Sequence, residues 1–241
     1  TTTNFLDPIS TTIGRQEFGT GYDGRNISSV IVWDNVLNYK KAFGKHSLDA
    51  MAGSSWTQSK WSQNYINGSN YANDLFPTLN AANKISWTGT GSSASDWAIL
   101  STFARLQYNW NDTYMVTANM RADGSSKFAP NHQWGYFPAA AVAWRIIDEP
   151  FMKSTTNWLS NLKLRLSYGE AGSDNISSSL WQETYDAEEK VVDGETGLVF
   201  SSTGLKSNPD LKWETTVSRN IGLDFGLFNN RLSGTVDLYW N

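Results

Sequence analysis

Few residues of this sequence have the type and spacing that catalysis or metal binding requires. The 241 residues include two histidines, His46 and His132, and no cysteine. Neither histidine has a glutamate or a second histidine at the spacing of a zinc site. The lack of cysteine also excludes disulfides, thiolate metal sites and cysteine nucleophiles. We therefore expect neither a metal site nor a catalytic role for either histidine.

Two short stretches combine residues that anion binding or acid–base chemistry uses. The run DGSS at residues 123–126 has the composition of a loop that holds a phosphate or a cation. No helix is expected after it to offer an anion-binding terminus, so a hairpin turn is the better interpretation. The adjacent carboxylates of Asp148 and Glu149 are expected to cap a short helix near residues 148–154 rather than to act as acid and base.

Charge and hydropathy narrow the class of protein. Lys and Arg total 19 against 23 Asp and Glu, and no basic block follows that would track a phosphate backbone, so nucleic acid is not an expected partner. No apolar run has the roughly 18 to 20 residues of a membrane-spanning helix. The 12 Trp, 10 Tyr and 11 Phe are many for a chain of this size and need a location. A membrane β-barrel stays possible, because only every second residue of its strands meets lipid.

Apolar and polar residues alternate along much of the chain. In residues 114–123 the even positions are Tyr, Val, Ala, Met and Ala, and the odd positions are Met, Thr, Asn, Arg and Asp. In residues 162–169 Leu and Tyr alternate with Lys, Arg, Ser and Gly. This period of two indicates strands with one apolar face. Eight strands are predicted, over residues 29–39, 46–56, 98–110, 114–123, 134–145, 162–169, 217–227 and 231–240.

The predicted connections are sorted by length. Two connections of about forty residues, 57–97 and 170–213, leave the same end of the sheet as the loop at residues 124–133. The tight turns lie at the other end. An antiparallel up-and-down meander with this asymmetry is typical of a transmembrane β-barrel, which has short periplasmic turns and long outer loops. The sequence thus predicts an all-β fold in a Gram-negative outer membrane.

A barrel wall gives the charged and aromatic residues a place. The apolar row of each strand would face outer-membrane lipid and the other row a wet lumen. Five charged residues share the polar parity and are expected in the lumen, where they contact a plug or solvate the wall: Arg105, Arg121, Asp123, Lys163 and Arg165. Aromatic residues near strand ends are expected at the headgroup level: Tyr39, Trp110, Tyr114, Trp144, Phe228 and Trp240.

Several motifs follow one another in a fixed order. Residues 105–108 read R-x-x-Y, residues 121–128 read RADGSSKF, residues 134–138 read WGYFP, and residues 162–169 read LKLRLSYG. The run NPDLKWE follows at residues 208–214. In this order and spacing they resemble the SusC/RagA family of TonB-dependent outer-membrane transporters.

The resemblance implies a transporter larger than this chain. It implies a barrel of about 22 strands, of which residues 1–241 would be a part, with the plug domain and the TonB box outside this chain. It also implies TonB and a SusD-like surface lipoprotein as partners, and an oligosaccharide or a peptide as the ligand. A transporter of this kind makes no covalent bond, so we expect no enzyme activity, no catalytic residue and no cofactor. The chain starts without an initiator Met and stops inside an alternating run, so we expect a piece of a longer protein.

Aromatic residues in the two long connections are candidates for contact with the ligand or a partner, or pack within the loops themselves. They are Trp61, Tyr65, Tyr71, Trp87, Trp181 and Tyr185. The same aromatics leave an alternative open, a secreted soluble β-sandwich that binds carbohydrate. That alternative explains neither the sorting of the connections nor the order of the motifs. A complete barrel of eight strands is the third possibility.

Overall fold

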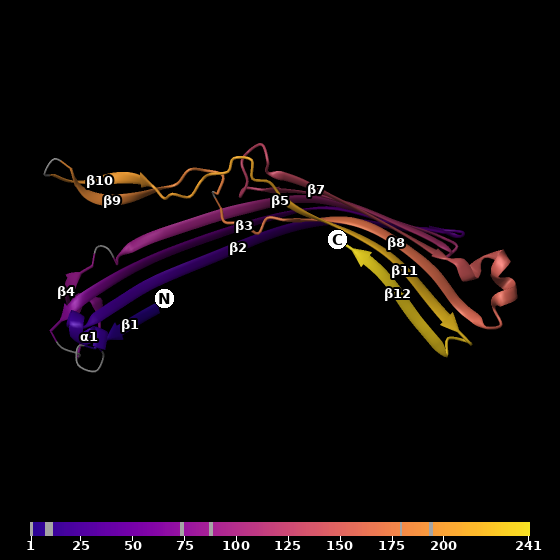
Figure 1. Ribbon diagram of the computed structural model, residues 1–241, viewed down its shortest axis with the longest axis horizontal. Helices are drawn as coiled ribbons and strands as arrows, with labels where there is room; N and C mark the ends of the chain where they lie inside the picture. The colour runs from indigo at the N-terminus through magenta and orange to yellow at the C-terminus, as the bar shows by residue number, and fades with distance from the viewer. Residues whose placement is uncertain (1, 8–11, 73–74, 87–88, 179, 193–194) are drawn as a thin grey trace. The chain divides into compact units, whose positions relative to one another are not determined.

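The computed structural model describes residues 2–7, 12–72, 75–86, 89–178, 180–192 and 195–241 (Figure 1). These residues fold almost entirely into antiparallel strands. The elements are β1 (Thr2–Leu6), α1 (Thr12–Glu17), β2 (Thr20–Phe43), β3 (His46–Tyr71), η1 (Leu79–Ala81), β4 (Ala82–Ile85), β5 (Gly91–Trp110), β6 (Tyr114–Ser125), β7 (Trp134–Arg145), η2 (Ile146–Asp148), η3 (Pro150–Thr155), β8 (Leu159–Ser173), β9 (Tyr185–Val192), β10 (Glu195–Ser202), β11 (Glu214–Leu227) and β12 (Leu232–Trp240). No helix in these ranges is long and apolar enough to span a membrane.

One open sheet contains most of the strands. Its order is β1-β2-β3-β5-β6-β7-β8-β11-β12, with β4 paired to β3, and β9 and β10 form a separate antiparallel pair. All eight predicted strands are present, and each neighbours the next in an up-and-down order. The first and last strands of this path do not pair with each other. The predicted all-β partial barrel is confirmed.

Three strands are longer than the sequence analysis predicted. β2, β3 and β5 extend well past the predicted ranges, so residues 58–71 and 91–97 are strand where a forty-residue connection was expected. Likewise β8 runs on to Ser173, and the β9–β10 pair occupies part of the other predicted loop. The physical reason is that the extensions are rich in Ser, Asn, Gln and Thr, so the ladder continues after the apolar row has ended.

The connections still differ by end. Within the second unit, residues 126–133 and 174–213 leave what we call the long-loop end. Residues 44–45, 111–113 and 228–231 form tight turns at the opposite, short-turn end, which also carries the longer connection 146–158. Left-handed backbone closes these short turns, at Gly44, Asn111, Asp112 and residues 228–230. Gly, Asn and Asp tolerate that conformation best. The predicted short helix at residues 148–154 is a pair of 3-10 turns, η2 and η3.

The chain divides into two compact units. One comprises residues 1–31 and 58–97, and the other comprises residues 32–57 and 98–241. In the second unit the register separates two faces of the sheet. An apolar row crosses six strands through Tyr108, Val116, Val142, Leu166, Ile221 and Leu238. The adjacent row on the opposite face is Gln107, Thr117, Ala141, Ser167, Asn220 and Tyr239.

The apolar face is well exposed in the chain by itself. Val116 is 44% exposed, Val142 is 47% exposed and Leu166 is 43% exposed. Three aromatic rings stack in a row where β5, β6 and β7 meet the short-turn end: Trp110 and Tyr114 have centroids 5.3 Å apart, and Tyr114 and Trp144 have centroids 6.3 Å apart. An apolar band that ends in amphipathic rings has the pattern of a surface facing lipid.

The most tightly packed part of the second unit lies at its long-loop end. Phe128, in the loop after β6, is 1% exposed, and its ring lies 5.3 Å from that of Trp213. Phe137 packs on the other side of Trp213 at 5.4 Å. The indole nitrogen of Trp213 donates a hydrogen bond to the carbonyl of Gln133 at 2.8 Å. A Cβ added to Gly135 would lie 2.5 Å from Phe137, so this packing requires glycine there.

Polar contacts hold the same loop. Ser125 is fully buried and donates through its hydroxyl to a carboxylate oxygen of Asp174 at 3.0 Å. The ammonium of Lys127 lies 3.5 Å from that carboxylate and donates to the Asp174 carbonyl at 3.0 Å. Asp123, Gly124 and Ser125 thus end β6, and the turn begins at Ser126, so the predicted hairpin turn starts later than expected. Asp174 and Trp213 both come from the distant connection between β8 and β11 and were not singled out from the sequence.

Replacing Phe128 with Ala tests this packing. We expect Phe128→Ala to lower the free energy of unfolding of the full-length protein by about 3 to 5 kcal/mol, because the ring leaves a cavity beneath Trp213. Urea unfolding in detergent micelles measures the change. Phe151→Ala is the matched control, since Phe151 is 64% exposed. Equal losses for the two variants would contradict the buried position of Phe128.

The two faces of β8 make a second test. Leu164 lies on the apolar face opposite Trp144 and Leu223, whereas Arg165 lies on the polar face. We expect Leu164→Arg to impair assembly in the outer membrane, because an Arg facing lipid costs about 2 to 4 kcal/mol near mid-membrane and less toward the interface. Arg165→Leu should have a milder effect. Heat-modifiable migration of the full-length protein reports assembly, and equal effects would refute the assignment of the faces.

Candidate functional site

The polar face of the second unit brings together the five predicted charged residues. Arg105 lies on β5, Arg121 and Asp123 on β6, and Lys163 and Arg165 on β8. The register places all five on the face that carries Thr117 and Ser167. Their shared face is as the parity predicted, whereas contact with a plug stays a prediction.

Arg165 is the centre of a network that spans three strands. Its Nε and Nη2 donate to the two carboxylate oxygens of Asp224 at 2.9 Å each, and Nη2 also donates to Asp237 at 3.1 Å. The hydroxyl of Thr235 donates to Asp224 at 3.0 Å. Gly222 allows this, because a Cβ there would lie 2.7 Å from Cζ of Arg165. A guanidinium held in two-pronged contact has little freedom left to bind anything else.

The sequence analysis selected Arg165 but not its acidic partners. Asp224 is 59 residues away and Asp237 is 72 residues away. Both occupy polar positions of their alternating strands, so their face was readable from parity. Their pairing with Arg165 depends on the register of three strands, which the sequence pattern does not give.

A second group surrounds Arg121. Its Nε lies 2.7 Å from the carboxylate of Asp123, its Nη2 donates to the hydroxyl of Ser101 at 2.9 Å, and its Cζ lies 5.8 Å from the Phe103 ring centroid. Within the described residues, one oxygen of Asp123 and Nε of Arg105 are buried without a hydrogen-bond partner. Buried polar atoms normally find a partner in protein or water. These two atoms, with the side-chain oxygen of Asn109 on the same face of β5, have capacity left to bind another molecule.

The structure corrects the location of three candidate aromatics. Trp61, Tyr65 and Tyr71 were expected in an outer loop, and that expectation is wrong, because all three lie on β3. Trp61 and Tyr65 are four positions apart on the same face, and Tyr65 stacks with Tyr22 at 6.5 Å. Tyr71 is 4% exposed and packs edge-on against Phe5 at 5.0 Å. Tyr71 is therefore buried within the first unit, and of the three residues it is the least suited to contact a ligand or a partner.

The remaining candidate aromatics lie in connections. Trp181 is half-buried in the connection after β8. Tyr185 begins β9, is 57% exposed, and donates through its hydroxyl to Glu183 at 3.0 Å. That carboxylate raises the pKa of Tyr185 above its usual value. Trp87 lies outside the described residues.

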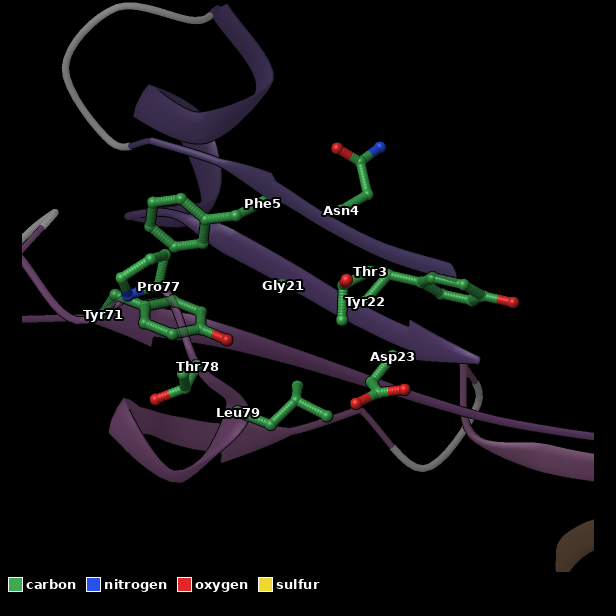
Figure 2. A pocket seen from close by; sticks show the side chains of 10 residues that line it. All are labelled: Thr3, Asn4, Phe5, Gly21, Tyr22, Asp23, Tyr71, Pro77, Thr78 and Leu79. Atoms are coloured by element: carbon green, nitrogen blue, oxygen red, sulfur yellow. The ribbon is translucent and has the colours of Figure 1, made fainter. Parts of the chain in front are cut away.

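A pocket of about 260 Å³ opens in the first unit between β1, β2 and the chain that precedes η1 (Figure 2). Its lining residues are Thr3, Asn4, Phe5, Gly21, Tyr22, Asp23, Tyr71, Pro77, Thr78 and Leu79. The hydroxyl of Tyr71 lies against the backbone of Gly21, where a side chain would clash with it. Among the described residues this hydroxyl has no hydrogen-bond partner. The pocket thus combines aromatic rings with one carboxylate and several hydroxyls.

The residues first considered for chemistry have structural contacts. His46 accepts from or donates to the Tyr108 hydroxyl through Nδ1 at 2.7 Å, and His132 lies 3.7 Å from Asp210. No cluster of three His, Asp or Glu that could hold a metal occurs in the described ranges.

The predicted capping role of the two adjacent carboxylates is wrong. Glu149 occupies the N-cap position of η3 without a side-chain capping bond. It accepts hydrogen bonds from the Tyr114 hydroxyl and, at 2.9 Å, from the Trp144 indole instead. These donors hold the pKa of Glu149 below its usual range. Asp148 pairs with Arg145 at 3.3 Å. The carboxylate of Glu149, which was predicted to cap a helix, instead accepts hydrogen bonds from aromatic side chains at the ends of β6 and β7.

The Arg165 network predicts an order of coupling energies. A double-mutant cycle between Arg165→Leu and Asp224→Asn should give about 1 kcal/mol, and the cycle with Asp237→Asn should give less, because Asp237 meets one nitrogen and is more exposed. The midpoint of urea unfolding of the full-length protein in detergent measures both. Arg165→Leu with Lys163→Met is the control cycle, for which no favourable coupling is expected. The reverse order for the two aspartates would contradict the network.

Comparisons with known sequences agree with this geometry. Residues 1–241 match the family described as TonB dependent receptor-like, beta-barrel. TonB-dependent receptor P39 of Formosa agariphila is 34% identical over 232 residues, which are 94% of this chain and 21% of that protein. TonB-dependent receptor SusC of Bacteroides thetaiotaomicron is 30% identical over 243 residues, which are 100% of this chain and 23% of that protein.

Solved structures have the same strand arrangement. The structure of the RagAB peptide transporter superposes with a TM-score of 0.80 at 28% identity, over 92% of this chain and 24% of that one. The RagAB peptide importer in its open-open state gives a TM-score of 0.78 at 28% identity, with the same coverage. The chain thus spans less than a quarter of the length of these proteins. Because the family match extends from residue 1 to residue 241, the chain belongs to the TonB-dependent receptors, as part of a SusC/RagA-type β-barrel.

Proposed function

We propose that the full-length protein imports an oligosaccharide or a peptide across the outer membrane as a TonB-dependent transporter. The observation that carries the proposal is the superposition on the RagAB peptide transporter, with a TM-score of 0.80 over 92% of the chain. The two-faced sheet supports it, since one face suits lipid and the other suits an aqueous interior.

The proposed mechanism assigns the barrel wall a passive role. Residues 1–241 form part of the barrel, and the plug domain and the TonB box belong to other parts of the full-length protein. A SusD-like surface lipoprotein captures the ligand over the long-loop end. TonB then pulls on the plug, with energy from the inner-membrane proton gradient, and the ligand passes to the periplasm. No covalent bond is made or broken.

The polar face would serve as the inner wall. Arg165 with its two aspartates would stiffen that wall across β8, β11 and β12. The unpaired atoms of Arg105 and Asp123 would be the points at which the plug or a passing ligand makes hydrogen bonds. This assignment extends the sequence prediction of lumen contacts. It distinguishes residues whose hydrogen bonds are already formed within the wall from residues that have an atom without a partner.

The candidate aromatic residues of each unit would meet the ligand or the lipoprotein. Trp61 and Tyr65 share one face of β3, and Tyr185 is exposed on β9. Aromatic rings of this kind stack on sugar rings and also contact peptide side chains, so they suit both ligand classes.

The alternative of a secreted β-sandwich is not favoured. A sandwich needs two packed sheets, and the described strands form one large sheet and one separate pair. The family match points the same way.

The test is to purify the full-length protein from detergent-extracted outer membranes and identify what accompanies it. We expect a surface lipoprotein to copurify, and uptake of a labelled glycan or peptide to cease when TonB is deleted or the proton gradient is collapsed. Growth on single glycans or on peptides as the sole nutrient then separates the two ligand classes. Uptake that continues without TonB would overturn the proposal.

A variant pair locates the ligand contacts. Trp61→Ala should weaken ligand binding several-fold, because one stacked ring contributes about 1 kcal/mol. Trp158→Ala is the control, since Trp158 lies near the short-turn end and is 49% exposed. Isothermal titration of the purified complex measures both, and equal losses would remove Trp61 from the site.

A further inference from the structure

Arg219 lies on the wrong face of the sheet for a charged residue. It pairs with Tyr168 of β8 and Trp240 of β12, and its β11 neighbours on that face are Ile221 and Leu223. In β6, β7, β8, β11 and β12, all of which the structure describes in full, every other Arg or Lys is on the polar face. An Arg facing lipid is tolerated only near an interface, where the bilayer gives way to headgroups.

The position of Arg219 along the strands fits such an interface. β11 begins at Glu214 after the long connection, and β8 runs past Tyr168 toward the same connection. Arg219 is thus toward the long-loop end, while Leu223 and Leu227 lead away from it. In a barrel the long loops are on the outer side, so Arg219 would stand at the level of the outer-leaflet headgroups.

The side chain of Arg219 is exposed and free to bind. Its Cζ lies 5.8 Å from the centroid of the Tyr168 ring. It makes no hydrogen bond or ion pair with any described residue. Glu170, two positions beyond Tyr168 on β8, accepts a hydrogen bond from the Tyr168 hydroxyl. A planar guanidinium with unused donors is the group best suited to a phosphate.

An apolar groove begins beside the guanidinium. It has a volume of about 360 Å³, and Ala140, Val142, Leu166, Tyr168, Arg219, Ile221 and Trp240 are among its lining residues. The small side chain of Ala140 leaves room between the larger Tyr168 and Val142. A guanidinium beside an apolar groove is complementary to a lipid that carries a phosphate and an acyl chain.

We propose that Arg219 binds a phosphate of an outer-leaflet glycolipid of the lipid A type, and that one acyl chain of this lipid lies in the groove formed by Ala140, Val142, Leu166 and Ile221. The inference rests on the proposed outer-membrane location. Tyr168 and Trp240 flank the guanidinium and limit its movement, so the phosphate is held at one level of the wall.

The experiment uses the full-length protein in mild detergent and native mass spectrometry with added lipid. The probes are lipid A, lipid A without its phosphates, and phosphatidylglycerol. We expect lipid A to bind the wild type, and its affinity to fall about tenfold or more in Arg219→Gln, because a hydrogen-bonded charge pair is lost. Arg231→Gln, the same change at the short-turn end, should leave binding unchanged. Ala140→Trp should fill the groove and weaken binding, while Ala104→Trp on the same face should not.

Three results would overturn the proposal. Lipid A without phosphates that binds as tightly as intact lipid A would exclude a phosphate site. Unchanged affinity in Arg219→Gln would mean that the arginine merely extends toward water. Phosphatidylglycerol that binds as tightly as lipid A would replace the glycolipid with a general anionic phospholipid. Separate fractionation of the cell tests the outer-membrane location, so its failure is distinguishable from a failure of the lipid site in detergent.

Discussion

In lipid, every backbone N–H and C=O must find a partner within the protein, and this constraint governs the structure of the chain. An antiparallel ladder meets it only if each strand is paired on both sides over its whole membrane-crossing length. β6 is paired on both sides over residues 114–124 and β11 over residues 219–227, whereas β7 and β8 pair with each other over residues 139–145 and 163–169. A continuous ladder fixes the register, and a fixed register makes alternate residues face opposite environments. The two-faced pattern of the side chains is therefore a consequence of the hydrogen bonding of the backbone.

The polar face shows how such a wall handles its charges. Arg165 pairs across the sheet with carboxylates of β11 and β12, whereas Arg121 pairs with Asp123 of its own strand. Gly222 is needed because the Arg165 guanidinium lies close over the backbone there. The alanines at positions 139, 141 and 143 leave space on the same face beside this network.

The parts of the strands that carry the apolar row could be predicted from the sequence. The alternation with a period of two follows directly from the lipid on one side of the sheet and the aqueous interior on the other. The extensions of β3 toward Tyr71 could not be predicted, because outside the apolar row both faces carry Ser, Asn and Gln and the period disappears. The partners of Arg165 and the packing of Phe128 on Trp213 also escaped prediction. They depend on which residues of distant strands and loops meet, and no local pattern records that.

The difference between polar side chains that have hydrogen-bond partners and those that lack one limits which residues could select the proposed ligand. Side chains with their hydrogen bonds filled, such as Arg165 and Asp224, would have to give up a partner before they could bind a ligand, and that exchange yields little net energy. A polar atom that is buried without a partner already has a desolvation cost. A ligand that forms a hydrogen bond with it removes that cost, so the bond gives a larger net gain in binding free energy. Arg105, Asp123 and Tyr71 each have such an atom. A glycan supplies hydroxyls that both donate and accept, whereas a peptide supplies N–H donors and C=O acceptors in fixed alternation. In the proposed importer, the unpaired donor on Arg105 and the unpaired acceptor on Asp123 would suit either ligand class, so discrimination between glycan and peptide would come from the shape of the surfaces around them.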